Sequence, residues 1–176
     1  EKPLPTSQYF IRLGQRLLAA LTVRTSEGGL FEVDMRLRPT GNKGPISTSL
    51  ETFRNYHADD AWTWERMALT RARVVAGAPE LADRLRATIT DILSRPRDLA
   101  TLAQDVASMR ERIAGEHKPT SPWAIKHWRG GLVDIEFTAQ YLQLREASAH
   151  PNVVASNTVT ALINLQAIGA LWPQDF

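Results

Sequence analysis

The sequence predicts an α+β protein that is predominantly helical, with a β-hairpin near its start and a helical bundle after it. Residues 30–38 alternate apolar and polar side chains, as a half-buried strand does, directly after a glycine-bearing turn at 25–29. From residue 47 onward, apolar residues recur with helical spacing between proline and glycine boundaries. The two patterns place the hairpin before the helical bundle.

The first part of the chain supplies the hairpin. Residues 7–24 begin as an amphipathic helix and pass into a β-capable stretch at 21–23. The strand at 30–38 ends at Pro39. Its two faces consist of Phe31, Val33, Met35 and Leu37 on one side and of Glu32, Asp34, Arg36 and Arg38 on the other. Two strands alone form a marginal sheet, so the pattern indicates that further strands belong to it.

Helices account for the rest of the chain. After a loop at 40–47, Ser47, Thr48 or Ser49 can cap a first helix, and a second runs from Asp59 or Asp60 to about Ala76. Further helices are expected from Pro79 to before Pro96, from Asp98 to about Ala114, from about Leu132 to Ala147 and from about Thr158 to Ala170.

Composition limits the classes of function. The net charge is +2, which is too mild for a general nucleic-acid binder. The chain has no cysteine, and no apolar run approaches the roughly 20 residues that span a bilayer. The 4 histidines lack the spacing of a zinc site. We therefore expect no nucleic-acid partner and no membrane partner.

The polar face of the predicted strand is the first candidate site. It combines the carboxylates of Glu32 and Asp34 with the guanidiniums of Arg36 and Arg38. Carboxylates hold Mg²⁺, and cations neutralise phosphate oxygens, so phosphoryl and nucleotidyl transfer use this mixture. A solvent-facing strand with cross-strand ion pairs has the same pattern, and spacing alone leaves both interpretations open.

Glu65 is the second candidate. It falls within the broad apolar arc of the predicted second helix, where a carboxylate must be paired or hydrogen-bonded. We expect a mostly buried Glu65 in a structural ion pair with Arg36 or Arg38, or else bonded to a backbone amide. A catalytic role is the alternative.

A basic, glycine-bearing loop at 126–131 precedes the predicted helix at Leu132. Such a loop at a helix N-terminus can bind an anion, and Lys126 is the candidate phosphate contact. Asp134 and Glu136 also suit the helix dipole simply as stabilisers, so a structural role remains open.

Three strings of the sequence resemble glutamine synthetase adenylyltransferases, in that family's order and approximate spacing. They are FEVDMRLRPTGNKGPISTS at 31–49, AWTWERMALTRARVVAG at 61–77 and IKHWRGGLVDIEF at 125–137. The resemblance implies that residues 1–94 form the C-terminal part of a nucleotidyltransferase core. It implies that residues 95–176 form the helical domain that accompanies such a core.

The resemblance also implies a chemistry. The complete enzyme would transfer AMP from ATP to a tyrosine of glutamine synthetase, with Mg²⁺ held by three carboxylates. Asp34 matches the third carboxylate, and so would be catalytic and a metal ligand, while Arg36 and Arg38 would either neutralise phosphate charge or pair with Glu65. The Asp-x-Asp segment that carries the other two carboxylates does not occur in this sequence. The chain is therefore expected to be a fragment that is inactive alone.

The form WTWE at 62–65 with RARVV at 71–75 is more similar to the attaching, C-terminal half of these enzymes than to the AMP-removing half, which stays the alternative. The resemblance implies glutamine synthetase and the signalling protein PII as partners, and a cytoplasmic location. A non-catalytic helical interaction module, with basic loops that bind a partner, is the alternative from a different class.

Overall fold

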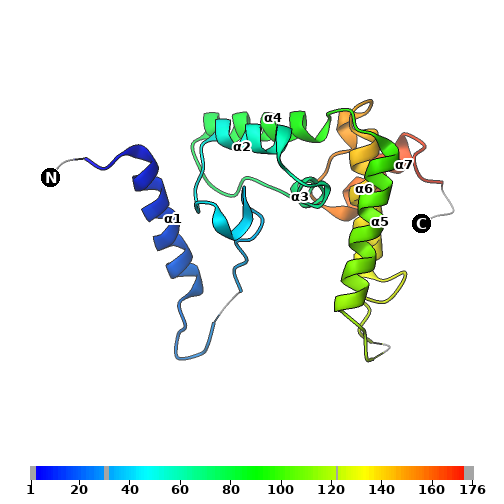
Figure 1. The fold of residues 1–176 in the computed structure, drawn as a ribbon, viewed down its shortest axis with the longest axis horizontal. Helices are drawn as coiled ribbons and strands as arrows, with labels where there is room; N and C mark the ends of the chain where they lie inside the picture. Colours follow the sequence, from blue (N-terminus) through cyan, green and yellow to red (C-terminus); the bar gives the residue numbers. More distant parts are fainter. Residues whose placement is uncertain (1–2, 30–31, 122, 173–176) are drawn as a thin grey trace. The chain divides into compact units, whose positions relative to one another are not determined.

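The computed structural model describes residues 3–29, 32–121 and 123–172. The chain divides into two compact units, Glu1–Asp60 and Ala61–Phe176. Each unit is built from α-helices and short 3₁₀ turns (Figure 1). No helix in the described part of the chain is both long enough and apolar enough to cross a bilayer.

The first unit contains α1 (Thr6–Thr22), the 3₁₀ turn η1 (Gly41–Lys43) and α2 (Leu50–Asp59). Helix α1 includes the stretch at 21–22 that was expected to be β-capable, and none of its residues is buried. A Cβ atom on Gly14 would lie 2.7 Å from Cγ2 of Ile46, so the absence of a side chain allows this close approach. The side chain of Ser49 accepts a hydrogen bond from the Thr52 amide, which confirms the predicted cap of α2.

The predicted β-hairpin is wrong for the described residues, among which no strand occurs. Thr25 and Gly28 exchange two backbone hydrogen bonds of 3.0 Å, so a tight turn does form. Residues 32–35 have no regular structure and 36–40 form turns, while Leu30 and Phe31 lie outside the described residues. A segment of alternating apolar and polar residues becomes a strand only when a neighbouring strand pairs with its backbone. Here the amide of Arg36 is used locally, by the Asp34 side chain.

The second unit is a helical bundle centred on α6. Helix α6 packs against α3, α5 and α7, and α3 also contacts α4 and α5 (Figure 1). The elements are α3 (Thr63–Leu69), α4 (Pro79–Leu93), α5 (Leu99–Glu116), α6 (Leu132–Glu146), the turn η2 (Pro151–Val153) and α7 (Thr158–Ala167). The largest fully buried side chains are Ile92, Leu93, Leu144, Val153 and Leu165.

Helix α3 is shorter than predicted, since it ends at Leu69 rather than near Ala76. The buried hydroxyl of Thr70 donates to the Met67 carbonyl at 2.7 Å. The amides of Thr70 and Arg71 bond three residues back rather than four, which is the tight geometry of a helix end. Apolar periodicity continues past this point in the sequence, but the hydroxyl of Thr70 competes for the backbone acceptor.

The later helices begin and end close to the predicted positions. Helix α4 starts at Pro79, and Asp98 caps α5 by accepting from the Thr101 amide at 2.7 Å. These signals act within one helical turn, which explains why sequence reveals them. The functional division expected between residues 94 and 95 stays a prediction.

Arg97 joins the end of α4 to the bundle. Its guanidinium donates to the carbonyl oxygens of Ile92 and Leu93, at 2.7 and 2.8 Å, and reaches that of Leu144 on α6 at 3.5 Å. The two shorter bonds satisfy acceptors that a helix C-terminus leaves without an intrahelical partner. Burial, with Arg66 and Arg95 nearby, lowers the pKa of Arg97 to about 10, so the group stays charged at neutral pH.

Candidate functional site

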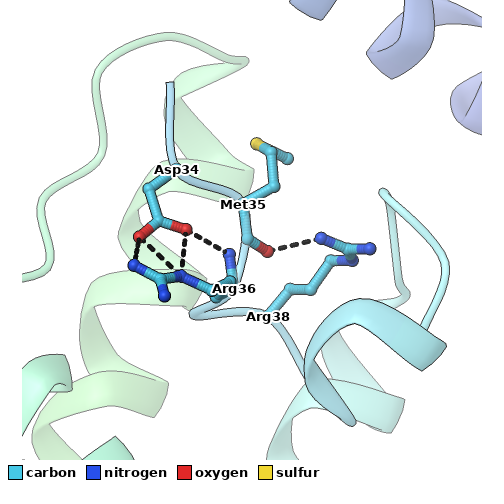
Figure 2. Close-up of polar contacts among 4 residues, drawn as sticks. All are labelled: Asp34, Met35, Arg36 and Arg38. Atoms are coloured by element: carbon cyan, nitrogen blue, oxygen red, sulfur yellow. Dashed lines mark hydrogen bonds and ion pairs between the residues drawn. The ribbon is translucent and has the colours of Figure 1, made fainter. Parts of the chain in front are cut away.

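Asp34 and Arg36 form a close ion pair in the first unit (Figure 2). Nε of Arg36 donates to both carboxylate oxygens of Asp34, at 3.0 and 2.9 Å, and Nη2 donates to Oδ2 at 2.7 Å. The Arg36 backbone amide donates to Oδ1 at 2.8 Å, which folds the chain around the carboxylate. The Asp34 side chain remains 53% exposed, so it is open to a ligand from solvent.

The hydrogen bonds from Arg36 lower the pKa of Asp34 below its ordinary value. At neutral pH this group is therefore a carboxylate, an oxygen ligand of the kind that Mg²⁺ prefers. The described residues contain no group of three or more His, Cys, Asp or Glu that could hold a metal ion. Asp34 thus suits one position of a metal site, but the described residues do not form such a site by themselves.

Arg38 stabilises the loop that follows Asp34. Its Nη1 donates to the Met35 carbonyl at 2.5 Å, and its Nε donates to that of Gly44 at 3.1 Å (Figure 2 shows the contact with Met35). Gly44 must lack a side chain, because a Cβ there would lie 2.1 Å from the Pro39 carbonyl oxygen. The structure therefore brings Asp34 and Arg36 together and gives Arg38 a role in holding the turns at 36–44.

Glu65 is buried in the second unit, with only 8% of its surface exposed, as its place in the sequence pattern indicated. Its Oε2 accepts a hydrogen bond from the Trp62 amide at 2.8 Å, at the start of α3. This confirms the predicted bond to a backbone amide and forms the Glu half of a capping box. The ion pair of Glu65 with Arg36 or Arg38 stays a prediction.

The loop before α6 is held by an ion pair that the sequence did not reveal. Nε of Arg110, on α5, donates to Oδ1 of Asp134 on α6. Oδ2 of Asp134 accepts from the Gly130 amide at 2.5 Å, and Arg110 also reaches the carbonyl oxygens of His127 and Trp128. The Arg110 hydrogen bond is the first cause of the lowered pKa of Asp134.

Lys126 lies exposed in this loop, in the second unit. The amides of Leu132 and Val133, at the start of α6, donate to the Ile125 and Lys126 carbonyls at 3.2 and 3.1 Å. An anion at this helix start would compete with these internal acceptors, which favours the structural interpretation of the loop. Phosphate binding by Lys126 stays a prediction.

The ion pair of Arg71 with Glu136 joins two segments that are distant in the sequence. Nη1 of Arg71 donates to Glu136 at 2.7 Å, and the pair ties the segment after α3 to α6. The two residues are 65 positions apart in sequence. Helical spacing in the sequence cannot show that these two side chains meet.

A cavity of about 380 Å³ lies between α5 and α6. Apolar side chains including Val106, Phe137 and Tyr141 form its walls, and Arg110 with Asp134 stand among them. The two charged groups neutralise each other, so the cavity offers an apolar hollow beside a fixed ion pair.

Comparison with known proteins identifies proteins similar to this chain. A family model described as glutamate-ammonia ligase adenylyltransferase matches residues 1–88. A protein of Bradyrhizobium diazoefficiens is 49% identical over 174 residues, which are 99% of this chain and 17% of that protein. A protein of Brucella suis is 55% identical over 144 residues, or 82% of this chain and 15% of that protein.

A Rhodopseudomonas palustris protein is 47% identical over 175 residues, 99% of this chain and 18% of its own length. All three are named bifunctional glutamine synthetase adenylyltransferase/adenylyl-removing enzyme. The chain spans less than a fifth of the length of each of these relatives. The family match covers half of the chain, and the three relatives align along 82–99% of it. The chain belongs to the glutamate-ammonia ligase adenylyltransferase family.

Proposed function

We propose that this chain acts as part of a longer enzyme that transfers AMP from ATP to a tyrosine of glutamine synthetase. The observation that carries the proposal is the 49% identity, over 99% of the chain, to a relative named as a glutamine synthetase adenylyltransferase/adenylyl-removing enzyme. The expected PII partner and the cytoplasmic location belong to the same proposal.

In this reaction the tyrosine oxygen forms a bond to the α-phosphorus of ATP, the phenol proton is released, and pyrophosphate leaves. Mg²⁺, when bound with ATP, would neutralise phosphate charge. Asp34 would supply one oxygen ligand to it. The lowered pKa of Asp34 favours this ligand role over that of a general base, because a weakly basic carboxylate is a poor proton acceptor.

Arg36 would serve the site in two ways. Its guanidinium orients Asp34 through bonds of 2.7–3.0 Å, and one face of it stays open, since the side chain is 73% exposed. The same guanidinium could then bind a phosphate oxygen while it holds Asp34. Arg38 would act as a positioning residue, because its guanidinium is engaged by the backbone carbonyls of Met35 and Gly44.

The first test uses the full-length enzyme that contains this segment, with glutamine synthetase, Mg²⁺ and ATP labelled on the α-phosphate. We expect Asp34→Asn to reduce AMP attachment at least about a hundredfold, since the neutral amide is a poor metal ligand. Asp83→Asn is the matched control, because Asp83 also forms an exposed ion pair, with Arg86 at 2.6 Å. A folded Asp34→Asn enzyme that both attaches and releases AMP at the normal rates would refute the role of Asp34 as a metal ligand.

The same variant distinguishes the two halves of the family's activity. If the segment belongs to the attaching half, Asp34→Asn abolishes attachment and leaves release of AMP from pre-labelled glutamine synthetase intact. Loss of release with normal attachment would assign the segment to the removing half instead. The 176-residue chain alone is expected to attach no AMP, because Asp34 stands without the Asp-x-Asp carboxylates.

A further inference from the structure

Large apolar side chains stand exposed around the connection between α5 and α6. They are Trp123, Ile125, Trp128, Leu132 and Ile135, with 44–87% of their surfaces accessible, and we call them the α5–α6 apolar surface. Folding normally buries side chains of this size. Several such residues within one short segment favour an interaction surface.

The backbone beneath this surface is firmly built. The amide of Leu132 donates to the carbonyl of Ile125 at 3.2 Å, and the indole N–H of Trp128 donates to the carbonyl of Ser121 at 2.9 Å. A Cβ on Gly131 would lie 2.1 Å from the Ile125 carbonyl oxygen, so only glycine permits this closure. The surface is therefore preorganised, which reduces the entropy lost on binding.

The same segment is exclusively basic. Residues 117–133 contain three cations (Lys118, Lys126 and Arg129) and no Asp or Glu. Asp134, the next residue, is already paired with Arg110 and bonded to the Gly130 amide. All three cations are exposed, and Lys126 and Arg129 lie on either side of Trp128 in the sequence.

We propose that the α5–α6 apolar surface binds an acidic segment of a partner protein that carries aromatic or aliphatic side chains. Aromatic residues and arginine dominate the energetics of protein interfaces, and opposite charge steers the partner to them. A nucleic acid would use the three cations but leave the aliphatic residues uncovered, and the chain as a whole has a charge of only +2. This interaction goes beyond AMP transfer and requires neither ATP nor a metal.

The probe is a fluorescein-labelled random copolymer of Glu and Tyr, in a ratio of four to one, titrated with the 176-residue chain without nucleotide. We expect the copolymer to bind at least about tenfold more tightly than polyglutamate of equal length, because only the copolymer can cover the apolar residues. Binding should weaken as salt rises from about 50 to about 300 mM, because the Debye length shortens and the attraction between the opposite charges is screened more strongly.

Variants locate the contact. Lys126→Glu with Arg129→Glu should weaken copolymer binding at least about tenfold, and Trp123→Ala at least about fivefold. The matched controls are Arg73→Glu with Arg84→Glu, which are exposed elsewhere, and Trp62→Ala, whose side chain is 71% exposed in the native chain. Circular dichroism of each variant verifies the helical fold.

Three results would overturn the proposal. The first is equal affinity for the copolymer and polyglutamate. The second is an equal loss in the control variants. The third is binding to phosphatidylserine vesicles, or self-association, that the Trp123→Ala change abolishes while copolymer binding stays intact. Failure of AMP transfer in the full-length enzyme would leave this assay unaffected, so the two proposals can fail separately.

Discussion

Glu65 offers the sharpest test of how a buried carboxylate stabilises the bundle. It is 8% exposed and accepts the Trp62 amide at 2.8 Å, so Glu65→Ala removes the partner of a backbone N–H at the start of α3. Loss of a helix-capping bond costs about 0.5–2 kcal/mol, and loss of one buried methylene costs about 0.8 kcal/mol. The neutral alanine also removes a carboxylate that folding must desolvate, which offsets part of this loss.

Loss of the Trp62 bond and of the buried methylene should therefore reduce the free energy of unfolding of Glu65→Ala by about 2 kcal/mol, and a broken buried ion pair would bring the loss to roughly 3–5 kcal/mol. With a urea m-value of about 2 kcal/mol/M, the unfolding midpoint falls by about 1 M. Glu65→Gln retains an acceptor oxygen and should lower stability by less, about 1 kcal/mol.

Urea unfolding followed by circular dichroism measures these differences. Glu80→Ala is the matched control, because Glu80 occupies the first turn of α4 but is exposed, and its loss should change stability by no more than about 0.5 kcal/mol. A Glu65→Ala midpoint that matches the Glu80→Ala midpoint would refute the capping role. A loss above about 4 kcal/mol would instead point to a second buried charge that depends on Glu65.

Three further changes test the second unit. Arg110→Ala should lower the free energy of unfolding by about 2 kcal/mol, because it removes the cation paired with Asp134. Tryptophan fluorescence from the loop should also change. An unchanged urea unfolding midpoint would contradict this. The pKa of His127 is lowered, first by desolvation and then by His117, Lys126 and Arg110, so the unfolded chain binds the proton more tightly. Stability should therefore fall as pH drops below about 6.5, and His127→Phe should flatten the stability profile between about pH 7 and 5, whereas equal slopes would refute it. Leu165→Ala should cost about 2–5 kcal/mol, because Leu165 is completely buried, while exposed Val159→Ala should cost under about 0.5 kcal/mol.

Sequence reasoning succeeded where the deciding contacts are local. Ser49 and Asp98 cap their helices through bonds to amides three residues away, and Pro79 begins α4. The burial of Glu65 also followed from helical spacing, because its partner amide lies in the same turn. Capping chemistry and periodicity are both encoded within a few residues.

Longer-range features escaped prediction for an equally physical reason. The alternating run at 32–38 forms no strand, because a strand depends on a neighbouring strand that periodicity cannot supply. The ion pair of Arg110 with Asp134 joins residues 24 positions apart, and nothing in either local pattern identifies the other member. For the candidate site, sequence identified Asp34 and its neighbouring cations, but only the structure showed that Arg36 clasps the carboxylate with side chain and backbone together.

Arg97 has a consequence for how the second unit moves. Its guanidinium donates to the final carbonyls of α4 and reaches the backbone of α6. The last turn of α4 therefore cannot fray without breaking hydrogen bonds to a buried cation. Helix ends usually open first in hydrogen exchange. Here the amides at the end of α4 should exchange as slowly as those in the middle of α6, which makes the two segments one cooperative opening unit.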